Sequence, residues 1–207
     1  MTIHDRYAQQ VDGRIGSVME NIESDVPCRQ SLRLKSYSYA SQGAYIVTVR
    51  TQERRSILCE VLPHGELILN SVGRMVLDQW EKLPDRFPNI ELDAFIVMLN
   101  HIHAVIWIVG APLVGALDDE KTISNQTPAR DAPTLGNIVG ALKSLTTVEY
   151  IRGVRQLGWR PFQKRLWQRN YFEHVIRDEK ALDRIREYIQ GNPANWSIDR
   201  DNPHAIK

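Results

Sequence analysis

Residues 95–109, FIVMLNHIHAVIWIV, carry the clearest structural signal of this chain. The run is rich in β-branched and aromatic residues, which favour β-strands. It is interrupted at Leu99 and Asn100, so we expect either a tight turn between two strands or a kink within one long strand. The expected strands cover residues 90–98 and 101–109, and two histidines follow directly after the break.

These histidines, His101 and His103, lie two residues apart with Ile102 between them. Because side chains alternate between the two faces of a strand, both imidazoles project from the same face, with Cβ atoms about 7 Å apart. This spacing allows both to bind one divalent cation. The alternative is that they are hydrogen-bonded or partly exposed strand residues that bind no ligand.

Length and composition indicate an ordinary globular protein. The 207 residues are 43% hydrophobic and 25% charged, which suits one domain with appendages. The longest apolar run, residues 102–109, is too short for a membrane helix, and the N-terminus lacks a signal-peptide pattern, so we expect a cytoplasmic protein with no membrane partner. Cys28 and Cys59 lack Cys-x-x-Cys spacing, and no disulfide framework or cysteine zinc site is expected.

Further strands and helices are expected around the central run. Short strands are predicted at residues 44–49, 57–61 and 66–69, the last two flanking a turn at residues 63–65. Apolar residues at helical spacing predict three helices, which begin at residue 70 or 71 and end at Pro84, span residues 134–152, and run from the N-cap Asp178 to Gly191. This mixture of strands and helices over one sheet indicates an α+β fold.

Residues 150–177 are strongly basic and rich in aromatic side chains. They contain seven arginines or lysines, while Glu173 is the single acid. Such a composition is typical of a surface that neutralises phosphates and stacks unpaired bases. A solvated charged face over an aromatic core is the alternative.

The end of the last predicted helix places two polar side chains together. Tyr188 and Asn192 are four residues apart, hence on neighbouring turns of one helix face. Alternatively, Tyr188 is a core aromatic beside Ile185, and Asn192 is a C-terminal cap after Gly191.

Taken together, these residues resemble the single-tyrosine HUH transposases, and within them the REP-associated tyrosine transposases of bacteria. The resemblance covers about residues 31–196 and rests on five blocks in the expected order: residues 31–34 (SLRL), 92–103 (LDAFIVMLNHIH), 135–147 (LGNIVGALKSLTT), 166–177 (LWQRNYFEHVIR) and 188–193 (YIQGNP). One position departs from the family pattern, because Leu99 stands where a proline is common.

The resemblance implies a ferredoxin-like or RRM-like antiparallel sheet with helices packed on it, the HUH endonuclease fold. The transposase domain would cover residues 31–196, between an N-terminal polar extension (1–30) and a C-terminal tail (197–207). Residues 110–133, which are rich in turn formers, are expected to form a mobile excursion within it.

The family also implies the chemistry of the site. His101 and His103 would be metal ligands, Tyr188 the nucleophile, and Asn192 the polar residue that completes the metal site. Mixed nitrogen and oxygen ligands favour Mn²⁺ by affinity, whereas Mg²⁺ is favoured by abundance. A free phenol has a pKa near 10, so Tyr188 needs a nearby cation or base to attack a phosphate. We expect a 5′-phosphotyrosine intermediate and a free 3′-hydroxyl.

The expected substrate is single-stranded DNA beside a palindromic hairpin, bound by a monomer or homodimer in the nucleoid. The candidate DNA contacts are Arg152, Arg155, Arg160, Lys164, Arg165 and Arg169 for phosphates and Trp167 and Tyr171 for bases. The alternative function is a catalytically silent, domesticated transposase that binds hairpin DNA or RNA. A replication initiator or relaxase is disfavoured by the single candidate tyrosine and the small size.

Overall fold

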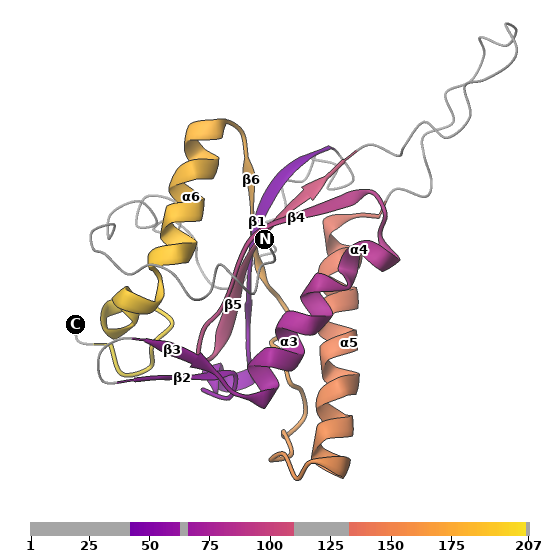
Figure 1. Ribbon diagram of the computed structural model, residues 1–207, viewed down its shortest axis with the longest axis vertical. Helices are drawn as coiled ribbons and strands as arrows, with labels where there is room; N and C mark the ends of the chain where they lie inside the picture. Colours follow the sequence, from indigo (N-terminus) through magenta and orange to yellow (C-terminus); the bar gives the residue numbers. More distant parts are fainter. Residues whose placement is uncertain (1–41, 63–65, 110–132, 206–207) are drawn as a thin grey trace, which may run out of the picture.

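The computed structural model describes residues 42–62, 66–109 and 133–205, and its ribbon is shown in Figure 1. The N-terminal extension, the block at residues 31–34, the turn at residues 63–65 and nearly all of the excursion at residues 110–133 lie outside the described residues. The expectations for these segments stay predictions.

A four-stranded antiparallel sheet forms the centre of the fold, with strand order β4-β5-β1-β6. Its strands are β1 (Gly43–Arg50), β4 (Ile90–Val97), β5 (His101–Ile108) and β6 (Phe172–Ile176). The predictions of β1, β4 and β5 are confirmed, and the break at residues 98–100 is a tight turn in which Met98 N–H donates to His101 O at 2.8 Å. The edge strand β6 was not predicted.

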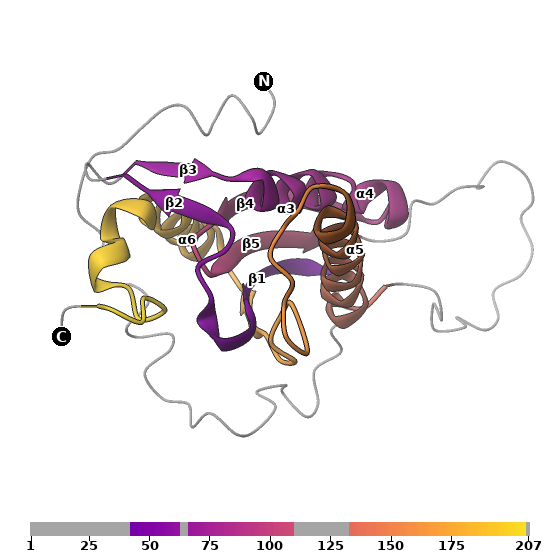
Figure 2. The ribbon, with the colours of Figure 1, turned by 90° about the horizontal axis from the view of Figure 1, so that it is seen from below.

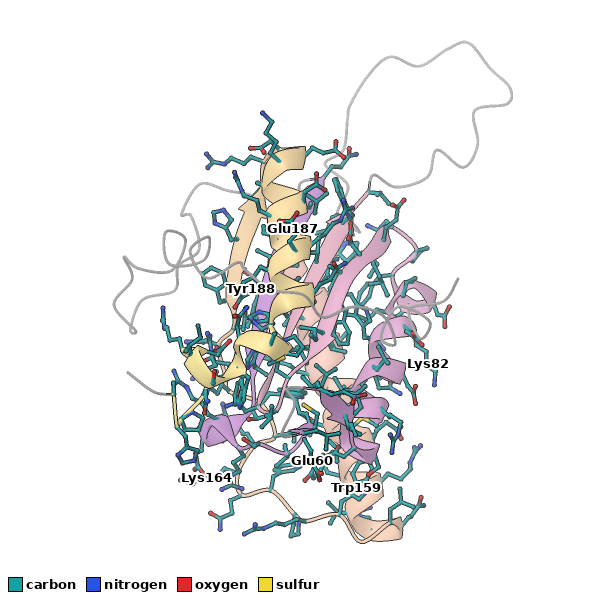
Figure 3. The ribbon with its side chains drawn as sticks, turned by 60° about the vertical axis from the view of Figure 1, so that its left-hand side comes forward. Glu60, Lys82, Trp159, Lys164, Glu187 and Tyr188 are labelled. Carbon is teal, nitrogen blue, oxygen red and sulfur yellow. The ribbon has the colours of Figure 1, made fainter. Side chains whose placement is uncertain are left out.

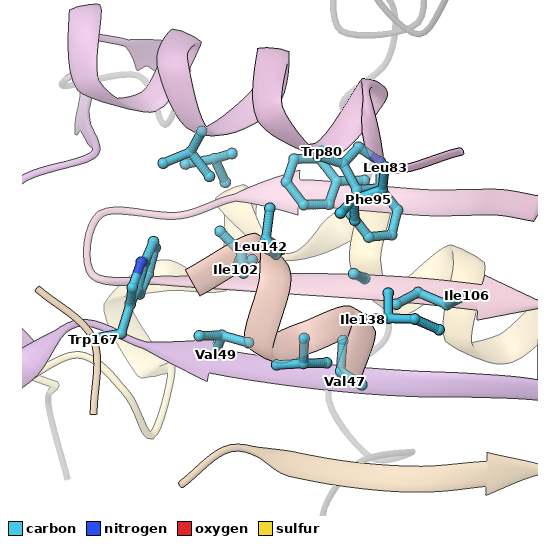
Figure 4. Packing of buried hydrophobic residues seen from close by; sticks show 14 of the residues in the cluster. Val47, Val49, Trp80, Leu83, Phe95, Ile102, Ile106, Ile138, Leu142 and Trp167 are labelled. Atoms are coloured by element: carbon cyan, nitrogen blue, oxygen red, sulfur yellow. The ribbon is translucent and has the colours of Figure 1, made fainter. Parts of the chain in front are cut away.

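Helices cover both faces of this sheet, as Figures 1 and 2 show. On one face, α3 (Ser71–Glu81) and α5 (Leu135–Gln156) bury the even-numbered side chains of β5, and Figure 4 shows Ile102 and Ile106 packed with Ile138 and Leu142. On the other face, α6 (Glu179–Gly191) packs its stripe of Leu182, Ile185 and Ile189 against Val105. The α+β prediction is therefore confirmed.

The helix starts follow their capping residues. Asn70 Oδ1 accepts from the N–H groups of Val72 and Gly73, and Asp178 Oδ1 accepts from Ala181 N–H, so both predicted N-caps are confirmed. The first helix ends at Glu81, however, because Pro84 lies in the first turn of a separate short helix, α4 (Leu83–Arg86). Pro84 thus starts a helix rather than ending one, a position that its missing N–H tolerates.

Two short strands form a separate ribbon beside the main sheet. β2 (Cys59–Val61) pairs antiparallel with β3 (Leu67–Leu69), as the sequence predicted, and the 3-10 turn η1 (Gln52–Arg54) precedes it. Gly73 lets α3 approach the chain before β2, since an added Cβ would collide with the Leu58 carbonyl oxygen. Among the described helices none is long and apolar enough to span a membrane.

Candidate active site

The two histidines lie at the start of β5, on the sheet face that α6 covers. His101 and His103 are 0% and 2% exposed, and their Nε2 atoms are 3.0 Å apart. Strand alternation aims both rings into the same space, while Ile102 between them enters the opposite core cluster. The prediction that both imidazoles share one face is confirmed.

Asn100 fixes the tautomer of His101. The amide nitrogen of Asn100 donates to the carbonyls of Arg54 and Asp201, at 3.2 and 2.8 Å. Its Oδ1 must therefore accept, at 2.8 Å, a hydrogen carried by His101 Nδ1. The lone pair of His101 Nε2 then faces His103, as in an imidazole that binds a metal through Nε2.

Thr48 holds the second histidine from the neighbouring strand. Its Oγ1 lies 2.8 Å from His103 Nδ1, and both side chains are buried. Because His101 Nε2 is an acceptor, His103 Nε2 donates to it, and His103 Nδ1 accepts from the Thr48 hydroxyl. If the Thr48 hydroxyl rotates so that it accepts a hydrogen from His103 Nδ1, then His103 Nε2 carries no hydrogen. The Nε2 atoms of both histidines then have free lone pairs. In that tautomer the Nε2 atoms of both histidines are available as metal ligands.

Burial keeps both imidazoles neutral. It lowers the pKa of His101 to about 4, an effect that the positive charges of Arg50 and Arg54 reinforce and the Asp201 carboxylate opposes. Burial also holds the pKa of His103 well below its ordinary value, with smaller contributions from His101 and Arg50. A neutral imidazole retains the lone pair that a metal ion requires.

Tyr188 reaches this pair from the last turn of α6 (Figure 3). Its Oη lies 3.3 Å from His103 Nε2, and the two rings meet edge to face with centroids 5.3 Å apart. Leu182, Ile185 and Ile189 anchor the helix to the sheet, so Tyr188 is half-buried at the border of that apolar stripe. The structure therefore brings the candidate nucleophile and the histidine pair together.

Asn192 follows Tyr188 by one turn and is 1% exposed. Its side chain hydrogen-bonds to Asp199, while its Oδ1 is buried and has no hydrogen-bond partner among the described residues. A buried amide oxygen without a partner is costly and calls for an explanation. Asn192 also links α6 to the 3-10 turn η2 (Pro193–Ile198) as the C-cap of the helix, and its role as a metal ligand stays a prediction.

This donor set is compatible with a divalent cation. Adjacent ligands of an octahedral ion at 2.0–2.1 Å are separated by about 3.0 Å, which matches the distance of 3.0 Å between the two Nε2 atoms. The described residues contain no group of three His, Cys, Asp or Glu side chains suited to a metal. Among the described residues, Asn192 Oδ1 is a buried acceptor without a partner and is the predicted third ligand.

An ion pair fixes α6 over the sheet. Arg186 donates from Nε and an Nη to both carboxylate oxygens of Asp93 on β4, at 2.9 and 2.7 Å, and Trp107 Nε1 donates to the same carboxylate. Burial alone would raise the pKa of Asp93, but the hydrogen bonds from Arg186 and Trp107 outweigh it and lower the pKa below its ordinary value. This contact holds the helix that carries Tyr188.

Sequence reasoning missed two charged residues beside the histidines. Arg50 is directly opposite His101 in the β1–β5 register, and its Nε lies 2.6 Å from Asp201 Oδ1. Asp201 is buried, and Trp196 of η2 places its ring 6.1 Å from that of His101. The alternation of side chains along β1 could have placed Arg50 on the face of the histidines, whereas nothing in the tail sequence indicated that Asp201 lies there.

The basic residues predicted to bind DNA lie on the surface, unlike the predicted aromatic ones. All six basic side chains are exposed: Arg152, Arg155, Arg160, Lys164, Arg165 and Arg169. Their segment passes the end of β1, where Gln168 N–H donates to Arg50 O at 2.9 Å. Its later residues thereby lie at the same end of the sheet as His101.

The two aromatic candidates face the other way. Trp167 is 5% exposed, and its Nε1 donates to Thr146 on α5 at 2.8 Å. Tyr171 packs against the same core cluster, with Lys143 Nζ 5.4 Å from its ring centre. The expectation that these rings stack on bases is corrected for Trp167, because a buried ring has no accessible face, and Tyr171 belongs to the α5 side of the sheet.

The chain is similar to proteins of two kinds, namely solved structures that share its fold and a curated protein with higher sequence identity. No protein-family model matches the chain. Among solved structures, it is similar to a REP-associated tyrosine transposase bound to a REP hairpin, with a TM-score of 0.48, 18% identity and coverage of 78% of this chain and 72% of that one. It is also similar to a candidate transposase of Deinococcus radiodurans R1, with a TM-score of 0.42, 17% identity and coverage of 75% and 93%. These likenesses concern the fold.

A protein of Haemophilus influenzae Rd, described as uncharacterized, is a much nearer relative. It is 34% identical over 173 residues, which are 83% of this chain and 92% of that protein. Identity at this level over most of this chain and of the matched protein means common descent, and the chain belongs to the same family as the Haemophilus influenzae protein.

Proposed function

We propose that the protein is a metal-dependent endonuclease and strand transferase that acts on single-stranded DNA next to a palindromic hairpin. The observation that carries the proposal is the contact between Tyr188 Oη and His103 Nε2, at 3.3 Å, beside a second imidazole at 3.0 Å. A protein that merely binds DNA has no need of a phenol in contact with two buried imidazoles, one helical turn from a buried, unpartnered amide oxygen.

In the proposed reaction, the Tyr188 oxygen attacks the scissile phosphorus. A bond forms between phosphorus and the phenol oxygen, and the bond from phosphorus to the 3′ oxygen breaks. The phenol loses its proton and the departing 3′ oxygen gains one, so the products are a 5′-phosphotyrosine and a free 3′-hydroxyl. Because the phosphodiester is conserved in the covalent link, a second 3′-hydroxyl can reverse the step and join two strands without ATP.

The residues that would hold the cation are His101, His103 and Asn192. When bound there, a divalent ion such as Mn²⁺ or Mg²⁺ supplies a Lewis acid that neutralises charge on the phosphate oxygens. Asn100 and Thr48 orient the two imidazoles from behind, and the neutral state of both rings avoids competition by protons. The Arg186–Asp93 pair holds α6, which carries Tyr188, against the sheet.

Single-stranded DNA is proposed as the substrate because Tyr188 projects from a helix and must approach a phosphate directly, which a paired and stacked duplex would hinder. The six exposed basic residues of the segment 152–169 would contact the backbone of the adjoining hairpin. The hairpin, read by its backbone and shape, would supply the selectivity that a single active site lacks.

Covalent trapping tests this function. The protein is incubated with 5′- or 3′-labelled single-stranded DNA that contains a palindrome from the neighbourhood of its gene, with Mn²⁺ or EDTA, and the products are separated on a denaturing protein gel. We expect a Mn²⁺-dependent covalent band that carries the label 3′ of the cut. Tyr188→Phe should abolish the band and leave DNA binding within about twofold, since it removes one hydroxyl.

Tyr171→Phe is the matched control, because it removes a phenol hydroxyl on the opposite side of the sheet and should leave the band unchanged. An undiminished adduct in Tyr188→Phe would remove Tyr188 from the role of nucleophile. Tight hairpin binding without any adduct, at any metal concentration, would instead identify a catalytically silent binding protein.

A further inference from the structure

Phe172 lies on the edge strand β6, on the same face of the sheet as His101 and His103. It pairs directly with Thr48 across the β1–β6 register, and Thr48 in turn pairs with His103 across the β1–β5 register. Residues directly opposite each other on neighbouring strands project to the same face. Since the Thr48 hydroxyl contacts His103, Phe172 projects to the face that holds the histidines and Tyr188.

Strand alternation separates Phe172 from the aromatic residues predicted earlier to stack on bases. Tyr171 precedes it and packs on the α5 side, as does Val175 farther along β6. Phe172 therefore stands on the α6 side, two strands from His103. With strands about 4.8 Å apart, the two residues are separated by about 10 Å across the sheet.

The ring of Phe172 is not part of either core. Phe87, Phe95 and Phe162 all belong to or pack against the cluster on the α3 and α5 face, whereas Phe172 is in neither that cluster nor the one under α6. Its side chain is half-buried, and no ring or cation contact involves it among the described residues. A partly exposed ring outside both described clusters, beside the polar site, leaves aromatic surface on which a base can stack.

We propose that Phe172 is a stacking platform for one unpaired base adjacent to the scissile phosphate. The inference rests on the proposed function and specifies how that site holds its single-stranded substrate. A strand whose phosphate lies between Tyr188 and the histidines would place a flanking nucleotide over the neighbouring strands β1 and β6. An aromatic face there can stack on any base, which is worth about 1–3 kcal/mol per base in single-strand binding.

The surrounding charges suit this path. Arg165 and Arg169 are exposed in the segment that leads into β6, and Arg177 is exposed just after it. A backbone that follows this edge would meet cationic side chains on either side of the stacked base. Glu173, the one acid of the segment, points to the opposite face because it neighbours Phe172 along the strand.

Abasic scanning of the substrate, combined with variants of Phe172, tests the proposal in the full-length protein. Binding of a labelled hairpin with single-stranded flanks is measured by fluorescence anisotropy, with one abasic site placed in turn at each flanking position. We expect a single position whose loss weakens wild-type binding about 5- to 150-fold. At that position, the abasic site should not weaken DNA binding by the Phe172→Leu variant any further, because the variant already lacks the ring that stacks on the base.

Leucine is chosen because it retains apolar volume without a π-face, and Phe172→Trp and Phe172→Tyr should restore the affinity. A purely structural role for Phe172 would give the opposite pattern, with leucine tolerated and tryptophan harmful. His174→Ala is the matched control, because His174 is exposed on the same face of β6 two residues along and farther from the histidine pair.

The outcomes separate this inference from the proposed function. If wild-type protein forms the covalent adduct but no flanking base matters, or if Phe172→Leu binds normally, the stacking proposal is overturned and the function stands. If wild-type protein forms no adduct yet shows the same single sensitive base, the stacking platform stands and the catalytic proposal falls. The abasic scan of the wild type gives its answer even if a variant fails to fold.

Discussion

The Thr48 hydroxyl can donate a hydrogen to His103 Nδ1 or accept one from it, and this choice sets the tautomer of His103. Replacing it by valine leaves Nδ1 without a partner, so the ring loses the contact that sets its orientation and tautomer. We expect Thr48→Val to weaken Mn²⁺ binding about 10- to 100-fold, the usual effect of removing a residue that orients a metal ligand. Isothermal titration calorimetry with Mn²⁺ measures this directly.

Thr146→Val provides the control for buried threonines, because Thr146 hydrogen-bonds to Leu142 and Trp167 on the opposite side of the sheet. It should lower the free energy of unfolding without changing Mn²⁺ affinity, and Thr48→Ser should bind Mn²⁺ as the wild type does. Equal affinities in Thr48→Val and wild type would show that Thr48 does not orient His103.

At the scale of the element, α6 depends on the pair between Arg186 and Asp93. The pKa of Asp93 lies below its ordinary value in the folded protein, so the pair stabilises the fold above about pH 4 and this contribution is lost as the pH falls through the folded pKa. We expect Asp93→Asn to lower the free energy of unfolding by about 1 kcal/mol at pH 7, a modest value because Arg186 is partly exposed to solvent. Urea unfolding at pH 7 and pH 3 measures the difference, which should shrink at the lower pH.

Asp183→Asn is the matched control, since Asp183 contacts the same arginine at 3.2 Å but is largely exposed. It should change stability by less than about 0.5 kcal/mol at either pH. A destabilisation of Asp93→Asn that is the same at both pH values would mean that packing, and not the charge, accounts for it. Loss of the pair should also slow formation of the adduct, because α6 carries Tyr188.

At the scale of the whole molecule, the exposed basic residues of the segment 152–169 and the histidine site lie toward the same end of the sheet. If these residues contact DNA phosphates, the logarithm of the binding constant should fall linearly with the logarithm of salt concentration, by about 0.9 per contact with the duplex stem and about 0.7 per contact with a single strand. Replacing Arg165 and Arg169 together by alanine should reduce that slope by about 1.4 to 1.8. Anisotropy titrations from low to moderate salt measure it.

Arg86→Ala is the control for a general change in charge. Arg86 is exposed on α4, which Figure 1 shows at the opposite end of α5 from the basic segment. Its loss should leave the slope unchanged. A slope that stays the same in the double variant would mean that these arginines are only a solvated surface, which was the alternative drawn from composition.

Local patterns account for much of this protein. The period of two along β5 placed His101 and His103 on one face, and hydrogen-bonding side chains marked where α3 and α6 begin. The spacing of four between Tyr188 and Asn192 likewise placed both on one side of a helix end. Each of these follows from backbone geometry within a few residues, and for that reason it can be read from the chain without its fold.

Features that join distant segments had no such local signal. Burial of Trp167, the contact of Arg50 with Asp201 and the face chosen by Phe172 all depend on which strand pairs with which and in what register. Composition showed that residues 150–177 hold cations and aromatic rings, but a shift of one residue in the pairing of β6 would exchange the faces of Tyr171 and Phe172. Pairing between distant strands therefore decided which aromatic rings of this segment lie in the core and which lie at the surface. Packing of distant elements also brought Tyr188 Oη within 3.3 Å of His103 Nε2, 85 positions earlier in the chain.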